Sequence, residues 1–160
     1  MKSVIIYATR YGSTAEVAGL IQKELGGDCT LVNVTAKNVP SLDTFDTVIL
    51  GGSIYMGKIQ KELAAFAETN LKQLLSKKVG LFLCAGTPEQ KEREKELHGA
   101  FPSELLIHAV AKDLLGYAFV FEKMRFFDRL IMKKIKGDSV STAEYFNERI
   151  SSFAKVLAAK

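Results

Sequence analysis

The chain has 160 residues, 48% of them hydrophobic and 25% charged, and a formal net charge of +4. These values are typical of a single globular domain that is large enough for a substantial core. No apolar run approaches the roughly 20 residues of a membrane-spanning helix, and no signal peptide is visible. Two cysteines and two histidines indicate neither a disulfide framework nor a metal site. We therefore expect one domain over residues 1–160 in the cytoplasm, with no nucleic-acid partner.

The first predicted strand leads into a polar loop and then into a helix. Val4–Tyr7 is a β-branched and aromatic run, which suits a strand covered on both faces. In the loop Thr9–Thr14, Gly12 lets the backbone approach an anion closely. Ser13 and Thr14 can cap the helix and also offer hydroxyl groups. Because a helix N-terminus presents unpaired N–H groups, the loop fits either a phosphate site or an ordinary capped turn.

Strands and helices alternate along the rest of the chain. The expected strands cover residues 29–34, 46–50, 79–84 and 114–121, and the expected helices cover 14–25, 59–75, 101–111 and 142–159. A charged helix start or lid is expected at 89–97. Five strands alternating with helices predict a parallel sheet with right-handed crossovers. Three polar loops that contain glycine, 9–14, 51–57 and 85–88, follow strand ends and could therefore share one ligand site.

The loop Gly51–Gly57 follows the third expected strand and fits a site for a planar ring. Tyr55 and Met56 can supply an apolar wall, and Gly57 a backbone that turns over at little steric cost. The alternative is a glycine-rich loop with Tyr55 packed on the sheet edge. The stretch nearly matches a phosphate-binding P-loop, but Ile59 stands where Ser or Thr should bind magnesium. We treat that match as chance.

The third loop, Cys84–Pro88, contains no aromatic residue. A ring bound beside it would be open to a substrate on its outer face, or covered by Tyr55 or by the charged segment after Glu89. Cys84 fits a buried structural thiol better than a reactive one. The chain has no GxGxxG dinucleotide fingerprint, and it lacks the clustered strand-end aspartates of a receiver domain.

The segment Lys123–Lys136 is basic and amphipathic. Met124, Phe127, Ile131 and Ile135 fall on one helical face. The pattern fits a helix that packs on the core with a solvated basic side. It also fits a contact with a membrane surface or a hydrophobic substrate.

The first loop resembles the FMN signature of flavodoxins, with an aliphatic pair, an aromatic residue, Thr, Gly, Thr and Ala at set spacings. These positions are filled by Ile5, Ile6, Tyr7, Thr9, Gly12, Thr14 and Ala18. The resemblance implies a flavodoxin-like α/β three-layer sandwich, with a five-stranded parallel sheet and helices on both faces. It also implies FMN as cofactor. The implied FMN contacts are Thr9, Arg10, Tyr11, Gly12, Ser13, Thr14, Ser53, Ile54, Tyr55, Met56, Gly57, Cys84, Ala85, Gly86 and Thr87.

A second resemblance covers most of the chain. Ser53, Ile54, Gly57 and above all Phe127–Lys133 resemble the flavodoxin-type, quinone-dependent protoporphyrinogen dehydrogenases of bacterial haem synthesis. This implies an FMN-dependent oxidoreductase that takes electrons from a porphyrin-like substrate and passes them to a quinone. No catalytic acid or base is identifiable, and flavin redox chemistry need not require one.

Two other functions stay open. One is a flavodoxin-type electron carrier for a redox protein partner, although such carriers are typically very acidic and this chain is basic. The other is a binding module that has lost FMN, which the complete first loop disfavours. If the basic segment Lys123–Lys136 binds lipid, the protein would lie peripherally at the inner face of the membrane.

Overall fold

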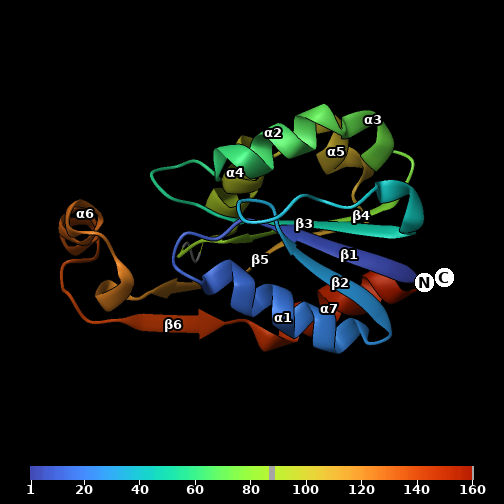
Figure 1. Cartoon of the computed structure of the whole chain (residues 1–160). Coiled ribbons are helices and arrows are strands. Elements are labelled where there is room, and N and C mark those ends of the chain that lie inside the picture. Colours follow the sequence, from blue (N-terminus) through green and yellow to red (C-terminus); the bar gives the residue numbers. More distant parts are fainter. Residues whose placement is uncertain (87–88, 160) are drawn as a thin grey trace.

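The computed structural model describes residues 1–86 and 89–159. Its middle layer is a six-stranded sheet with the order β2-β1-β3-β4-β5-β6 (Figure 1). Five strands run parallel, and the sixth pairs antiparallel to β5. The strands are β1 (Lys2–Tyr7), β2 (Asp28–Asn33), β3 (Thr47–Ser53), β4 (Lys78–Cys84), β5 (Ala111–Phe119) and β6 (Thr142–Tyr145).

Helices cover both faces of the sheet (Figure 1). On one face lie α1 (Ser13–Leu25) and α7 (Asn147–Ala158), and on the other lie α2 (Lys61–Thr69), α3 (Leu71–Leu74), α4 (Gln90–Ala100) and α5 (Ser103–His108). Short 3-10 turns occupy Leu42–Thr44 and Phe121–Lys123. The helix α6 (Phe126–Lys136) stands apart at one end of the molecule, between β5 and β6 in the chain. No helix in the described part of the chain has the length and apolar character needed to cross a membrane.

Alternating side chains of the central strands feed two cores. Ile5 and Ile49 pack towards α1 and α7 together with Phe82, whereas Val4 and Val48 pack towards the opposite helices. Both sets are fully buried. A strand that is covered on both faces reads as an unbroken apolar run, which is why the sequence predicts these strands well.

The predicted start of the helix at 142–159 is wrong, and the sheet has six strands instead of the expected five. Thr142–Tyr145 forms β6, which pairs with β5 from Gly116 opposite Tyr145 to Phe119 opposite Thr142. The helix begins only at Asn147, and Phe146 is half-buried just before it. The helical spacing of Phe146 from Ile150 and Phe153 imitates the apolar stripe of a longer helix.

Other boundaries move by a few residues. Gly51–Ser53 belong to β3 rather than to a loop, because their backbone continues the parallel ladder with β4. The expected helix 101–111 shortens to α5, and β5 begins three residues earlier than expected, at Ala111. The charged stretch after Glu89 forms the solvated helix α4.

The order β2-β1-β3-β4-β5 is one of the two common doubly wound arrangements, and it places a topological switch point between β1 and β3. Ligands of open α/β sheets bind beyond the carboxyl ends of the strands at such a point. The loops that follow β1, β3 and β4 therefore meet at this edge.

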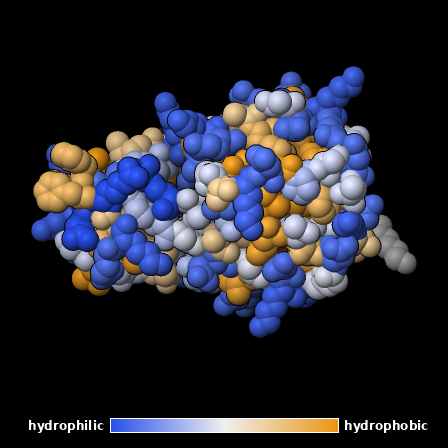
Figure 2. Space-filling view, in the orientation of Figure 1, coloured by the Kyte–Doolittle hydropathy of each residue, from blue (hydrophilic) through white to orange (hydrophobic). Residues whose placement is uncertain are grey.

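The helix α6 turns its apolar side outward. Phe126, Phe127, Leu130 and Ile135 are exposed, with Phe127 at 75%. Apolar and basic side chains adjoin at the end of the molecule where α6 lies (Figure 2). The core-facing alternative for the stripe Met124, Phe127, Ile131 and Ile135 is therefore wrong: of the four, only Met124 is buried, and it precedes the helix.

Candidate functional site

The loop after β1 is closed by its own groups. The Thr9 hydroxyl accepts a hydrogen bond from the Gly12 backbone N–H at 2.9 Å. Gly12 has a φ of 103°, a left-handed conformation that favours glycine. Gly12 is the N-cap of α1, and no side chain caps the helix. Ser13 and Thr14 are therefore helical residues, and our expectation that they cap the helix is wrong.

Thr14 is fully buried, and its Oγ1 has no hydrogen-bond partner among the described residues. Burying an unpaired hydroxyl costs about 1–3 kcal/mol. The hydroxyl lies in the first turn of α1, at a helix end with unpaired N–H groups. An anion bound at this end would be stabilised by the N–H groups and by the helix dipole.

The loop after β3 is held by Gln60. Its amide nitrogen donates to the Ser53 hydroxyl at 2.7 Å, and its Oε1 accepts from the Ser53 N–H at 3.2 Å. A two-residue turn follows, in which Tyr55 and Lys58 exchange backbone hydrogen bonds of 2.9 and 3.1 Å. Met56 and Gly57, at the turn, have φ values of 52° and 74°.

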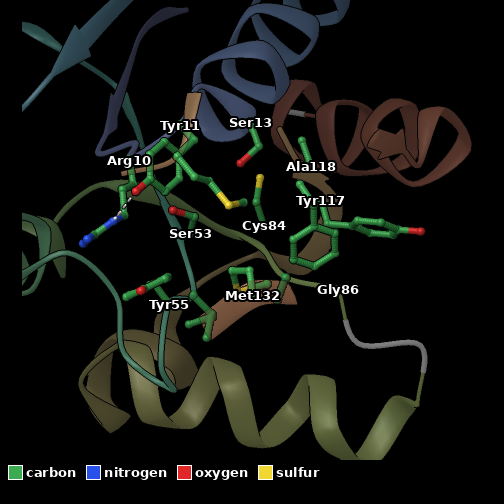
Figure 3. A pocket seen from close by; sticks show the side chains of 14 residues that line it. Arg10, Tyr11, Ser13, Ser53, Tyr55, Cys84, Gly86, Tyr117, Ala118 and Met132 are labelled. Atoms are coloured by element: carbon green, nitrogen blue, oxygen red, sulfur yellow. Dashed lines mark hydrogen bonds between the residues drawn. The ribbon is translucent and has the colours of Figure 1, made fainter. Parts of the chain in front are cut away.

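These loops line a hollow with a cavity volume of about 60 Å³ (Figure 3). Of the residues expected to bind the cofactor, nine line it: Arg10, Tyr11, Ser13, Ser53, Ile54, Tyr55, Cys84, Ala85 and Gly86. Thr9 and Gly12 shape the first loop, and Thr14 is buried in the first turn of α1. Met56 and Gly57 are exposed and are not part of the lining. Thr87, also expected at the site, lies outside the described residues.

The strand β5 supplies an aromatic wall that the third loop lacks. Tyr117 and Phe119 line the hollow, and their ring centroids are 5.6 Å apart. Gly86 packs closely against this wall, because a Cβ added there would lie 3.0 Å from the Phe119 ring. Met124 and Met132 complete the lining from the α6 region. These four side chains were not predicted, since only the fold brings them to the loops.

Asp128 on α6 joins the first and second loops. Its carboxylate accepts hydrogen bonds from the hydroxyls of Tyr11 and Tyr55 and pairs with Arg10, whose Nη2 lies 2.6 Å from Oδ2. The Arg10 guanidinium also stacks over the Tyr55 ring, 4.3 Å from its centroid. Asp128 is the one acidic residue in the basic segment Lys123–Lys136. That isolation was the signal in the sequence that could have marked it.

Hydrogen bonding governs the acidity of this cluster. Burial alone would raise the pKa of Asp128, but hydrogen bonds from Tyr11, Tyr55 and Arg10 outweigh it and lower the pKa to about 2. The carboxyl group is therefore ionised at neutral pH. Burial and the hydrogen bond to Asp128 raise the pKa of Tyr55 to about 12, so this hydroxyl remains a donor.

Cys84 is a buried free thiol in the lining of the hollow (Figure 3). Burial raises its pKa to about 12, and weak contacts with the side chains of Thr14 and Ser13 oppose the shift. The contact between the Cys84 thiol and the Thr14 hydroxyl does not have the geometry of a hydrogen bond. A thiol with such a pKa is an inert structural group rather than a nucleophile. Among the described residues, no group of three or more histidine, cysteine or acidic side chains could hold a metal ion.

The fold and these loops define a doubly wound α/β protein whose candidate site lies at the switch point of the sheet. The family model for the flavodoxin domain matches residues 4–146. This chain belongs to the flavodoxin domain family.

Known proteins resemble the chain over nearly its whole length. Protoporphyrinogen IX dehydrogenase (quinone) of Escherichia coli strain K12 is 26% identical over 175 residues, which cover 99% of this chain and 95% of that protein. Oxidised flavodoxin 1 from Bacillus cereus has a TM-score of 0.56 at 16% identity, covering 98% and 97% of the two chains. The Streptococcus pneumoniae flavodoxin has a TM-score of 0.57 at 15% identity, covering 99% and 98%. The two structures confirm the expected flavodoxin-like fold.

Proposed function

We propose that the protein binds FMN at the carboxyl ends of β1, β3 and β4 and acts as an FMN-dependent oxidoreductase. The observation that carries the proposal is the buried Thr14 hydroxyl, which lacks a partner among the described residues at the uncapped start of α1. A phosphate oxygen would satisfy both the hydroxyl and the helix N–H groups. FMN fits better than FAD because the chain has no dinucleotide fingerprint.

The proposed contacts divide between the loops. Thr9–Thr14 would hold the phosphate, while Ser53–Gly57 and Cys84–Thr87 would face the ring. Tyr117 supplies a flat aromatic surface on the side where the third loop has none. Bound FMN supplies electron transfer chemistry, and the protein contributes binding, orientation and electrostatics.

Within this function we propose a protoporphyrinogen dehydrogenase-like activity with a quinone as electron acceptor. Support comes from the Escherichia coli relative of that name, which matches 99% of this chain. The hollow also offers apolar and aromatic walls, Tyr117, Phe119, Met124 and Met132, for a flat ligand. The alternative is an electron carrier for a redox protein, which the net charge of +4 disfavours.

Replacing the Thr14 hydroxyl tests FMN binding. A Thr14→Val variant keeps the side-chain shape but cannot bond a phosphate. A hydrogen bond to a charged group is worth about 1.5–3 kcal/mol, so we expect FMN affinity, measured by quenching of flavin fluorescence, to fall about tenfold to a hundredfold. FAD should bind the unaltered protein more weakly than FMN does.

Thr47→Val is the matched control, because Thr47 Oγ1 is the other buried hydroxyl without a partner among the described residues. Thr47 begins β3, at the opposite end of the strand from the loops. Both variants should raise the free energy of unfolding without FMN, since each removes a buried unpaired hydroxyl. Only Thr14→Val should weaken FMN binding, and equal FMN affinity in the two variants would contradict the proposed site.

We further propose that the outer side of α6 contacts an anionic lipid surface, where a quinone would be found. Exposed Phe126, Phe127 and Leu130 lie on the same helix as the lysines of its last turn. No acidic side chain in the described ranges pairs with Lys133 or Lys134. Exposed aromatic and basic side chains on one helix match the headgroup region of an anionic bilayer, where each basic residue contributes about 1 kcal/mol.

Vesicle co-sedimentation tests this contact. We expect binding to anionic vesicles that weakens with salt, because the Debye length falls from about 10 Å at 0.1 M to about 3 Å at 1 M. Lys133→Glu with Lys134→Glu should abolish binding. The same charge change at Lys61 and Lys91, in the first turns of α2 and α4, should reduce it only slightly. Absence of binding at low salt, or burial of the α6 surface in a homodimer, would contradict the contact.

A further inference from the structure

A single buried carboxylate connects three segments that are distant in the sequence. Asp128 is 7% exposed. It binds Arg10 and Tyr11, which are more than a hundred positions away, and Tyr55, which is 73 positions away. Arg10 donates from both Nε and Nη2 to the same oxygen, at 3.0 and 2.6 Å. Such charge-assisted bonds are stronger than neutral ones and fix geometry.

The three partners of this carboxylate line the hollow, whereas Asp128 itself lies behind them. Any influence of Asp128 on a bound ligand therefore passes largely through Arg10, Tyr11 and Tyr55. Arg10 brings a full positive charge to the wall of the hollow. Its pairing with Asp128 makes the two side chains neutral together.

We propose that Asp128 is a positioning residue of the flavin site, which holds Arg10, Tyr11 and Tyr55 as one wall and neutralises the charge of Arg10. The proposal rests on the proposed binding of FMN. It assigns the carboxylate two effects: it anchors α6 to the loops after β1 and β3, and it keeps the reduction potential of bound FMN lower than an unpaired arginine would allow.

The sign of the electrostatic effect follows from charge. Reduced flavin tends to carry a negative charge, and a nearby positive charge favours an anionic form. Asp128→Asn removes the neutralising carboxylate and leaves Arg10 unpaired beside the hollow. Reduced FMN should then be stabilised more than oxidised FMN.

The first measurement compares the dissociation constants of oxidised and reduced FMN. In Asp128→Asn we expect the ratio of the oxidised to the reduced constant to rise about tenfold, which for a two-electron couple raises the potential by about 30 mV. Asp138→Asn is the matched control, since it makes the same charge change just beyond α6, where Asp138 pairs with Lys136. The control should leave the ratio within about twofold of the unaltered protein.

A second variant separates charge from loss of structure. Arg10→Gln leaves the charge of Asp128 without a cation. The ratio of the dissociation constants of oxidised and reduced FMN should therefore fall, which is opposite to the effect of Asp128→Asn. The double variant restores a neutral pair, and its ratio should return close to that of the unaltered protein. If Asp128→Asn acted by loosening the fold, adding Arg10→Gln would not restore the ratio, and that result would overturn the electrostatic assignment.

The ligand-free protein provides readouts that do not depend on FMN. In Asp128→Asn, Tyr55 should ionise at lower pH, as followed by tyrosinate absorbance, because the negative charge that helps to raise its pKa is removed while Arg10, which lowers it, remains. Trypsin should also cleave faster at Lys133 and Lys134. Unaltered protein that binds no FMN would defeat the proposed function, yet these two readouts would still test the cluster. Unchanged tyrosine titration and proteolysis in Asp128→Asn would overturn the positioning role.

Discussion

The two glycines at the end of β3, Gly51 and Gly52, are explained by packing rather than by ligand binding. A Cβ on Gly51 would lie 2.0 Å from the Phe82 ring, and a Cβ on Gly52 would lie 2.9 Å from Leu63. Both glycines therefore let helices and side chains pack closely against β3. The glycine-rich composition that suggested a ligand loop reflects the close packing of a strand end.

Met56 is a residue whose backbone conformation is unfavourable for its side chain. Among the described residues it alone has a positive φ without being glycine. A non-glycine residue in the left-handed region costs roughly 1–2 kcal/mol, and Asn tolerates that region better. We expect Met56→Asn, which creates the Asn-Gly pair favoured in such turns, to raise the free energy of unfolding by about 1 kcal/mol. Urea denaturation measures this change.

Met56→Leu is the control for this prediction, because it changes the side chain while the backbone strain remains. Met56 is 63% exposed, so neither change disturbs the core. Equal stability of the Asn and Leu variants would show that the turn carries no relievable strain.

The sequence predicts the part of the site that is local in the chain. Thr9–Thr14 are contiguous in the chain, from the loop after β1 into the first turn of α1, so their types and spacing suffice to place them together. Asp128 and Tyr117 reach the same place only through the order of the strands and the path of α6. Asp128 lies within Phe127–Lys133, the stretch that carries the second resemblance, but neither its sequence context nor that of Tyr117 specifies these contacts.

At the scale of elements, the largest error lies where two kinds of periodicity overlap. Thr142–Tyr145 is a four-residue strand directly followed by a helix whose apolar stripe extends back to Phe146. Pairing with β5 decides the conformation of these residues, and strand preference depends strongly on such context. In this pair Gly116 faces Tyr145.

The close contact at Gly116 leads to a prediction about β6. A Cβ there would lie 2.7 Å from the Glu144 carbonyl oxygen, a backbone atom that cannot move aside cheaply. Gly116→Ala should therefore lower the free energy of unfolding by about 1–3 kcal/mol, as typical for overpacking. Amide hydrogen exchange should show faster exchange in β6.

Gly99→Ala provides the comparison for this experiment. Gly99 lies in α4 with no atom within 4 Å of an added Cβ. Because alanine favours helix, this change should stabilise the protein by up to about 1 kcal/mol. If Gly116→Ala were equally harmless, β6 would not be tightly paired with β5.

The helix α6 shows what amphipathic spacing can and cannot predict. The segment has the expected apolar stripe, yet its inward side carries Asp128 and Met132 instead. Arg129 contributes to this orientation by donating to the Phe121 carbonyl oxygen at 3.0 and 2.8 Å. Periodicity identifies an apolar face, but the polar anchors decide whether that face points towards the core.

For the whole molecule, the alternation of strands and helices was sufficient to predict the parallel sheet. Right-handed crossovers leave few ways to connect five such strands, and the loops after β1, β3 and β4 then meet at one edge. We did not predict the antiparallel strand β6. The segment between β5 and β6 leaves the sheet and returns to the same edge, whereas most of the parallel strands are joined by crossover helices packed on the sheet.

That excursion begins and ends at neighbouring points of the sheet. Phe119 and Thr142 face each other in the ladder, so the segment between them closes a hairpin. Inside it, the Ser141 hydroxyl accepts a hydrogen bond from the Phe121 N–H at 3.0 Å and holds the two arms together. The segment can therefore change length or content without altering the register of any strand. During divergence from a common ancestor, such a hairpin would be an exchangeable module: replacing it leaves the five parallel strands in place but takes Met124, Asp128 and Met132 away from the hollow, so each descendant must rebuild that wall.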